Sequence, residues 1–299
     1  MSLVARLRFH GMRPFDREAM RMKRWLLCGA GMLWSAAVLA AGSRGESVRA
    51  SMLVAGTIEK APDGKVAAYA LDHPDKLPPA VRNLLAQAIP AWKFDPAAGN
   101  DEAATVKVPV TVRVVATTMD GGQVRLEIEG VHFGPQDDHP GIAVVKQEKP
   151  VYPPAAEHAL VHGTVYLAMR VDRAGKVADV AVQQVDMGVV GRDAELNRWR
   201  EVFGRVSREA ASRWIFTPAV DAASPYRIVR TSVTFAIDAF NGRSTRPAYG
   251  QWNVYEPGPV QPVPWLDNGQ SAGGVDALPD GDIDLVGQGP RLRLPKSPI

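Results

Sequence analysis

The residues of this chain that could carry chemistry are few and scattered. His158 and His162 are four residues apart, a spacing that permits shared metal ligation on one face of a helix. No Cys or carboxylate of matching spacing accompanies them, so we expect no metal site. The pair Asp280 and Asp282, like Asp137-Asp138, could suggest acid and base catalysis, but no nucleophile lies beside either pair.

Catalytic motifs give no further support to an enzyme. The sequence contains no Walker loop, no G-x-S-x-G and no H-E-x-x-H. The loose group of His132, Asp137, Asp138 and His139 is interpreted as a solvated turn. We therefore expect no catalytic residue, no cofactor and no metal, and a binding protein in place of an enzyme.

The strongest pattern is an internal repeat, which sets the elements that must position any site. Three motifs recur in the same order in both copies: Gly-Thr-Ile 56–58, Gly-Lys-Val 64–66 and Trp-Lys-Phe-Asp-Pro 92–96, then Gly-Thr-Val 163–165, Gly-Lys-Val 175–177 and Trp-Ile-Phe-Thr-Pro 214–218. Trp92 and Trp214 each end an apolar helical stripe, so both are expected in a core.

The first copy is predicted to contain a hairpin, a helix and further strands. The expected elements are strands 52–59 and 66–71, a helix over 78–92, and strands 106–116 and 123–133, the last two joined by the turn Asp120-Gly121-Gly122.

The second copy repeats this order. Alternating residues predict strands from 165 to 171 and from 177 to 185, followed by a helix that starts with Asp193 as N-cap. Gly204 and Ser207 could split that helix in two, and residues 228–237 supply a third strand. The fold class is thus α+β, with two tandem units that each pack a helix on a small antiparallel sheet.

The N-terminal 41 residues read as a basic leader and a signal peptide or short anchor. Residues 25–41 form an uncharged apolar run, and we favour cleavage after Ala40, with no structure assigned to residues 1–21. We therefore expect a periplasmic protein, or one held on the periplasmic side of the inner membrane if the run is retained. The only cysteine, Cys28, lies in this run, so the mature chain would have no disulfide.

The charge and the C-terminal composition complete the domain map. The net charge of +3 comes from the basic leader, which leaves the remainder nearly neutral and without the basic footprint of a nucleic-acid-binding protein. The units are expected at 51–133 and 144–240, joined by a linker at 134–143. Residues 241–299 carry nine Gly and nine Pro, so this tail is expected to be disordered or extended over the surface.

The second unit resembles the C-terminal domain of the TonB energy-transducer family. The resemblance rests on these residues: Pro150-Val151-Tyr152-Pro153, the Ala-rich turn 155–160, Gly163-Thr164-Val165, the hairpin 171–177, Ala210, Ala211, the motif 214–219 and the last strand. It covers about residues 144–240, with the first unit as a degenerate copy.

The resemblance implies a fold and a binding role. Family members have a helix on a three-stranded sheet and bind a short segment of an outer-membrane receptor, which adds as a strand to the sheet edge. The resemblance places that edge at 230–237. The partner-binding residues expected from it are Tyr152, Pro153, Arg230, Thr231, Ser232, Val233, Thr234 and Phe235.

Several alternatives stay open at this point. Tyr152 is either a partner contact or a residue packed where the chain enters the unit. Pro109 stands where the second unit has Ser232, and because proline lacks a ladder donor, recognition is assigned to the second unit, with Val233 as an edge donor.

The partner and the arrangement of the units also have alternatives. The partner is a receptor peptide or another envelope protein, with inner-membrane proton-motor proteins or a second copy of the chain as further candidates. The run 25–41 contains no His, and no Pro-, Glu- and Lys-rich spacer follows it, unlike the members that couple to a motor. The alternative function is a structural envelope protein whose repeats pair edge to edge and whose tail binds the partner.

Overall fold

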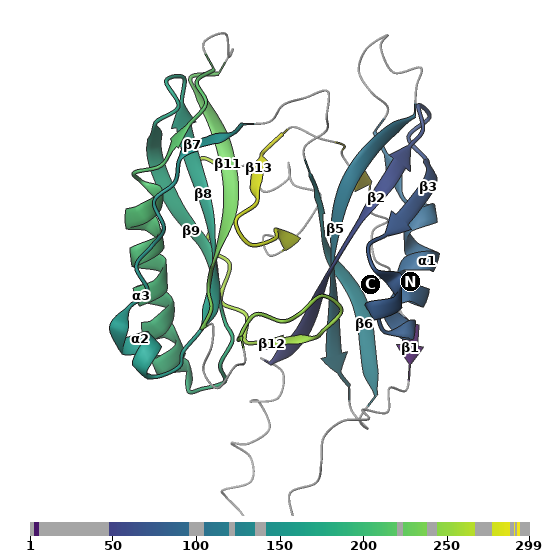
Figure 1. Ribbon diagram of the computed structural model, residues 1–299, viewed down its shortest axis with the longest axis horizontal. Helices are drawn as coiled ribbons and strands as arrows, with labels where there is room; N and C mark the ends of the chain where they lie inside the picture. Colours follow the sequence, from purple (N-terminus) through teal and green to yellow (C-terminus); the bar gives the residue numbers. More distant parts are fainter. Residues whose placement is uncertain are drawn as a thin grey trace, which may run out of the picture.

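A computed structural model describes most of the chain beyond the leader. The described residues are 48–95, 105–119, 123–134, 142–219, 224–237, 244–266, 277–287, 290 and 292–293, with the backbone alone of residues 3–5. The fold is mixed α+β, and every strand pairing is antiparallel. The two large sheets face one another, and the helices lie on their outer faces (Figure 1).

The first repeat forms one sheet covered by one helix. Its elements are β2 (Arg49–Lys60), β3 (Val66–Leu71), a 3-10 turn η1 (Pro74–Lys76), α1 (Pro79–Ala88), a second turn η2 (Ile89–Ala91), β4 (Lys93–Phe94), β5 (Val106–Thr118) and β6 (Val124–Phe133). β5 pairs with β2 on one side and with β6 on the other. The expected hairpin, helix and both later strands are confirmed, and the turn at 120–122 lies outside the described residues.

The second repeat has the same order of hairpin, helix and later strand, with a longer helix and two extra short elements, β7 (Val144–Lys146) and α2 (Pro154–His158), at its start. Its other elements are β8 (Gly163–Asp172), β9 (Val177–Met187), α3 (Asp193–Ala211), β10 (Ile215–Phe216) and β11 (Tyr226–Phe235). Its main sheet has the order β13-β11-β8-β9, where β13 (Ile283–Leu285) comes from the tail. β8 therefore lies between its hairpin partner β9 and the last strand of the repeat.

α3 differs from its prediction in two respects. It is one continuous helix through Gly204 and Ser207, because its buried stripe, which includes Trp199 and Phe203, continues across both residues. The N-cap is Arg192, and Asp193 is the first helical residue, where its charge still favours the helix N-terminus.

The repeated motifs make the same local contact in both units. The Phe after each core Trp donates its backbone N–H to the Gly of the hairpin turn: Phe94 to Gly64 and Phe216 to Gly175, each at 2.8 Å. Both glycines have positive φ, 79° and 85°. The strand that leaves the helix is thus tied to the tip of the hairpin, which explains why these residue types recur together.

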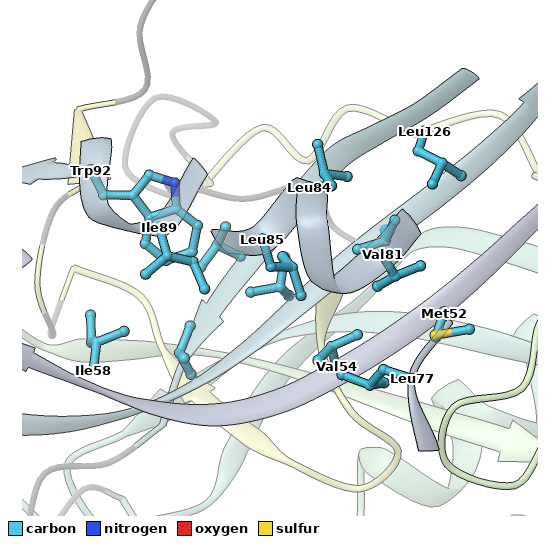
Figure 2. Close-up of a cluster of buried hydrophobic side chains, with 14 of the residues drawn as sticks. Met52, Val54, Ile58, Leu77, Val81, Leu84, Leu85, Ile89, Trp92 and Leu126 are labelled. Carbon is cyan, nitrogen blue, oxygen red and sulfur yellow. The ribbon is translucent and has the colours of Figure 1, made fainter. Parts of the chain in front are cut away.

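The core of the first unit lies between α1 and the sheet. Met52, Val54 and Ile58 of β2 point toward Leu85 and its neighbours on the helix (Figure 2). Trp92 and Trp214 are 4% and 2% exposed, so the prediction that both are core residues is confirmed. Burial of such large side chains contributes about 1.5–3 kcal/mol each.

The tail runs back and forth between the units. β12 (Asn253–Tyr255) pairs with β2, β13 pairs with β11, and β14 (Leu292–Arg293) pairs with β4. Between them, Val263 and Leu266 are buried against Ala168 on the inner face of the second sheet. The expectation of disorder is wrong for the described tail, because apolar faces and open strand edges of both units give it partners.

A buried polar cluster joins the two units and the tail. Arg113 of β5 is 4% exposed, and its guanidinium lies 3.6 Å from the Asp186 carboxylate, donates to the Tyr166 hydroxyl at 3.2 Å and sits 4.6 Å above the Tyr255 ring. Asp186 also accepts from the Gln184 amide at 2.7 Å and from the Gly258 backbone at 3.1 Å. The cluster fixes the facing arrangement of the sheets.

The repeats do not pair edge to edge among the described strands. No sheet in that part of the chain contains strands of both repeats, so that expected arrangement is replaced by two sheets that face each other across the tail. At the N-terminus, β1 (Leu3–Ala5) pairs with β6, although the sequence assigns no structure there.

The structure also bears on membrane-spanning helices. None of the helices it describes is both long and apolar enough to cross a bilayer. The apolar run 25–41 lies outside the described residues.

The turn glycine Gly175 should be intolerant of a side chain. We expect Gly175→Ala to destabilise the protein by at least about 3 kcal/mol, because positive φ alone costs about 1–2 kcal/mol and the new Cβ would lie 2.0 Å from the Phe216 carbonyl oxygen. Gly281→Ala is the matched control, since φ is 78° there and nothing lies within 4 Å of the added Cβ. If urea denaturation showed the same loss of unfolding free energy in both variants, this account would be contradicted.

The Arg113–Asp186 pair should be strongly coupled. Asp186→Ala is expected to lower the free energy of unfolding by about 3–5 kcal/mol, since it leaves a buried guanidinium without its carboxylate. Arg113→Met combined with Asp186→Ala should cost less than the sum of the two single changes. Additive losses in a double-mutant cycle would show that the two side chains do not interact.

Candidate functional site

The candidate site is the outer edge of β11, the side that faces away from β8. Besides the β11–β13 ladder, the tail makes further hydrogen bonds with the backbone of this edge. Val286 donates to the Ile228 carbonyl at 2.9 Å, Gly281 donates to the Ser232 carbonyl at 3.1 Å, and Thr234 donates its backbone N–H to the Asp280 carboxylate at 2.8 Å. Because backbone groups alternate along a strand, the even-numbered residues 228–234 face this edge.

This alternation corrects one expectation. Val233 directs its backbone N–H toward β8, opposite Val165, so it is not an edge donor. Ser232 and Thr234 direct theirs outward. A proline at 233 would therefore break the β8 ladder, whereas a proline at 234 would remove an edge donor.

β13 covers only the first half of the edge. Its register pairs Val229 with Leu285 and Thr231 with Ile283, and no strand in the described part of the chain pairs with β11 on this side beyond Thr231. Past that point lies a surface groove of about 280 Å³, which we call the edge groove. Its lining residues are Gln147, Lys149, Pro150, Tyr152, Trp214, Ser232, Val233, Thr234, Phe235, Ala236, Arg246, Asp280 and Gly281.

The edge groove brings together five of the eight expected partner-binding residues. Tyr152 and residues 232–235 line it. Arg230 and Thr231 lie beside β13 and are 7% and 1% exposed. Pro153 is the N-cap of α2, where its carbonyl accepts from Ala156, and it does not line the groove.

Tyr152 is packed as well as placed at the groove. Its hydroxyl donates to the Val161 carbonyl at 2.7 Å, and its ring meets Phe235 edge-on with centroids 5.5 Å apart. Burial raises the pKa of the Tyr152 hydroxyl to about 12, with a further contribution from Glu157. Tyr152 therefore holds the groove wall through fixed contacts.

The lining of the edge groove combines apolar and charged side chains. Pro150, Tyr152 and Phe235 are apolar lining residues, and Lys149, Arg246 and Asp280 carry charges. Arg246 forms an ion pair with Asp280. The Asp280 carboxylate, which accepts from the Thr234 backbone, occupies the place that a carbonyl of an added strand would take.

In the first repeat, β6 covers most of the corresponding edge. There Gly134 donates to the Pro109 carbonyl at 2.9 Å, as Gly281 does to Ser232 in the second repeat. β6 then pairs with β5 from Val110 to Thr118, the half that in β11 borders the edge groove. Pro109 is tolerated because its ring nitrogen faces the same side as its carbonyl, beyond the end of β6. The first repeat is therefore closed by β6 and not by the proline.

His132 differs from its interpretation as part of a solvated turn. It lies on β6, is 8% exposed and faces the tail acids. Burial lowers the pKa of its imidazole, Asp284 and Asp282 oppose that shift, and Arg230 adds to it. Asp137, Asp138 and His139 lie outside the described residues.

The other candidates for chemistry are not brought together. His158 ends α2, while the His162 ring lies 3.4 Å from the Leu160 carbonyl through Nδ1. Within the described ranges, no three His, Cys, Asp or Glu side chains are placed to hold a metal ion.

β13 is the element of the site that sequence reasoning missed. The signal for it is Asp282-Ile283-Asp284-Leu285, an alternation of acidic and aliphatic residues between Gly281 and Gly287. Such an alternation is typical of a short strand with one buried face.

Comparison with known proteins identifies no relative. No family model, no curated protein and no solved structure matches this chain.

The buried His132 should make the stability of the protein depend on pH. Unfolded histidine takes up a proton near pH 6.5, while the folded chain resists it, so the unfolded state binds more protons as the pH falls. We expect the free energy of unfolding to decrease from pH 7.5 to 5.5, by at most about 1.4 kcal/mol per pH unit.

The variant His132→Gln should flatten this dependence in urea denaturation. His158→Gln, which alters an exposed histidine, is the control and should keep it. An unchanged slope in His132→Gln would contradict the assignment.

Proposed function

We propose that this protein binds an extended peptide segment of a partner at the outer edge of β11, and that it is not an enzyme. The observation that carries the proposal is the edge groove, which lies beside the half of β11 that no described strand covers. An added strand there would meet the outward Thr234 N–H and the apolar lining residues of the edge groove. Main-chain hydrogen bonds would supply affinity, and the lining residues would select side chains.

The finer assignment follows the resemblance to the TonB C-terminal domain. On this reading the chain is a tandem of two such units, of which the second recognises the partner. The partner is an outer-membrane receptor segment or another envelope protein, and the compartment is the periplasm, or the inner-membrane surface if residues 25–41 are retained. Association with TonB-dependent transport across the outer membrane is part of the same proposal, whereas coupling to a proton motor would require residues 25–41 to be retained as an anchor.

The alternative of a tail-mediated partner site has less support. The described tail residues pair with β2, β11 and β4 of their own chain, so they are engaged internally. Deleting 241–299 would also uncover Ala168 and the inner face of the second sheet. Such a deletion therefore cannot separate the two functions cleanly.

Thr234 provides the test of the proposal. A library of random octapeptides displayed on phage would first be selected on the full chain, and the affinities of the selected peptides then measured by fluorescence polarisation. Thr234→Pro should weaken binding at least fivefold, since one backbone hydrogen bond contributes about 1 kcal/mol.

Thr234→Val is the matched control. It keeps the backbone donor and removes only the hydroxyl, which lies 3.2 Å from the Thr164 hydroxyl. Its affinity should stay within about twofold of the natural chain. Selection of no peptide, or equal losses in both variants, would contradict binding at this edge.

A further inference from the structure

Part of the proposed binding edge already holds an extended segment of this chain. Residues 279–286, which we call the resident segment, contact β11 from Ile228 to Thr234. Besides the backbone bonds, the Ser232 hydroxyl donates to the Pro279 carbonyl at 2.7 Å. The resident segment therefore sits as an added strand would.

The side chains of the resident segment divide between two faces. Ile283 and Leu285 pack on the core of the second unit, on the same face as Val229. Asp282 and Asp284 lie on the other face, where Asp284 is opposite Arg230 in register and both act electrostatically on His132. Asp280 adds the ion pair with Arg246. At this edge, aliphatic side chains of the resident segment thus pack on the core, and its acidic side chains lie near basic groups.

The strand that pairs the resident segment with β11 is short. β13 has three residues, whereas β6, which covers the outer edge of β5 in the first repeat, has ten. All three β13 residues are only half-buried. A longer segment could pair along the edge from 228 to 236 and fill the edge groove as well, so it would gain contacts that the resident segment lacks.

We infer that this edge selects extended segments in which acidic and aliphatic residues alternate, and that residues 279–286 are the resident competitor that such a partner segment displaces. The inference rests on the proposed function. The apparent affinity for a partner then equals the intrinsic affinity multiplied by the fraction of molecules in which the edge is open.

A reversible disulfide tests the displacement in the full chain. Thr231 and Ile283 form a non-hydrogen-bonded cross-strand pair. The Cα atoms of such a pair lie closer together than those of a hydrogen-bonded pair, which suits a disulfide. The variant combines Cys28→Ser, Thr231→Cys and Ile283→Cys. The probe is a fluorescent peptide with the sequence Leu-Pro-Asp-Gly-Asp-Ile-Asp-Leu-Val-Gly of residues 278–287.

We expect the reduced variant to bind the probe at least tenfold more tightly than the oxidised one. Cys28→Ser alone is the control and should bind equally with and without reductant. A probe with Lys in place of both alternating acids, at 282 and 284, should lose at least tenfold in affinity. Equal binding of that probe would overturn the acidic preference.

The outcomes separate the inference from the function it rests on. Equal binding in both redox states would overturn displacement but leave the edge groove as a peptide site. If the selected octapeptides bind and the probe does not, the inference fails alone, and if neither binds, the proposed function fails too. A stable dimer of the reduced variant in place of probe binding would make a second copy the occupant and overturn the proposal.

A second variant tests the displacement without the two introduced cysteines, in case the cysteine variant folds poorly. Asp284→Lys places a cation opposite Arg230, which should loosen the resident segment and raise probe affinity severalfold. Asp179→Lys makes the same charge change at an exposed position of β9, at the other side of the sheet, and should have no effect. Equal affinities in the two variants would contradict displacement.

Discussion

The backbone of an edge strand must find hydrogen-bond partners, and this requirement determines how the second unit is built. A strand at the end of a sheet exposes a row of N–H and C=O groups that another chain could pair with. The first repeat covers β5 with β6, which follows directly in the chain. Among the residues that the structure describes, the second repeat has no such strand of its own, and β13 comes from the tail.

The facing arrangement of the units follows from the same dependence on the tail. β12 pairs with the first sheet, whereas the segment around Val263 and β13 lie on the second, so each unit is completed by residues that come after both. Arg113 is buried at this junction, and Asp186, Tyr166 and Tyr255 surround it. A charge so deeply buried is tolerated only with such partners, so the cluster specifies one way of stacking the sheets.

Local patterns predicted much of the fold. The hairpins, the strands after the helices and the burial of Trp92 and Trp214 follow from alternation and helical spacing, since these depend on neighbours in the chain. The role of Pro109 and the burial of His132 were misread because both depend on which strand lies beside β5 and on what faces β6. A three-residue strand such as β13 gives only a weak local signal, and its partner is distant in the sequence.

The candidate site was predicted in position but not in detail. Side-chain alternation indicates which residues of β11 face the core. It does not indicate which backbone groups face the outer edge, because that depends on the register with β8. For this reason the edge donor was predicted at Val233, although Thr234 carries the outward N–H. Tyr152 was expected at the edge groove, whereas the contribution of Asp280 was not.

The position of β13 near the C-terminus also determines when the edge of β11 can be covered. A chain made from its N-terminus at about 5–20 residues per second completes β11 seconds before residues 283–285 exist. β6, by contrast, follows β5 almost at once. In a chain that emerges from its N-terminus, the edge of β11 is therefore covered by β13 later than the edge of β5 is covered by β6.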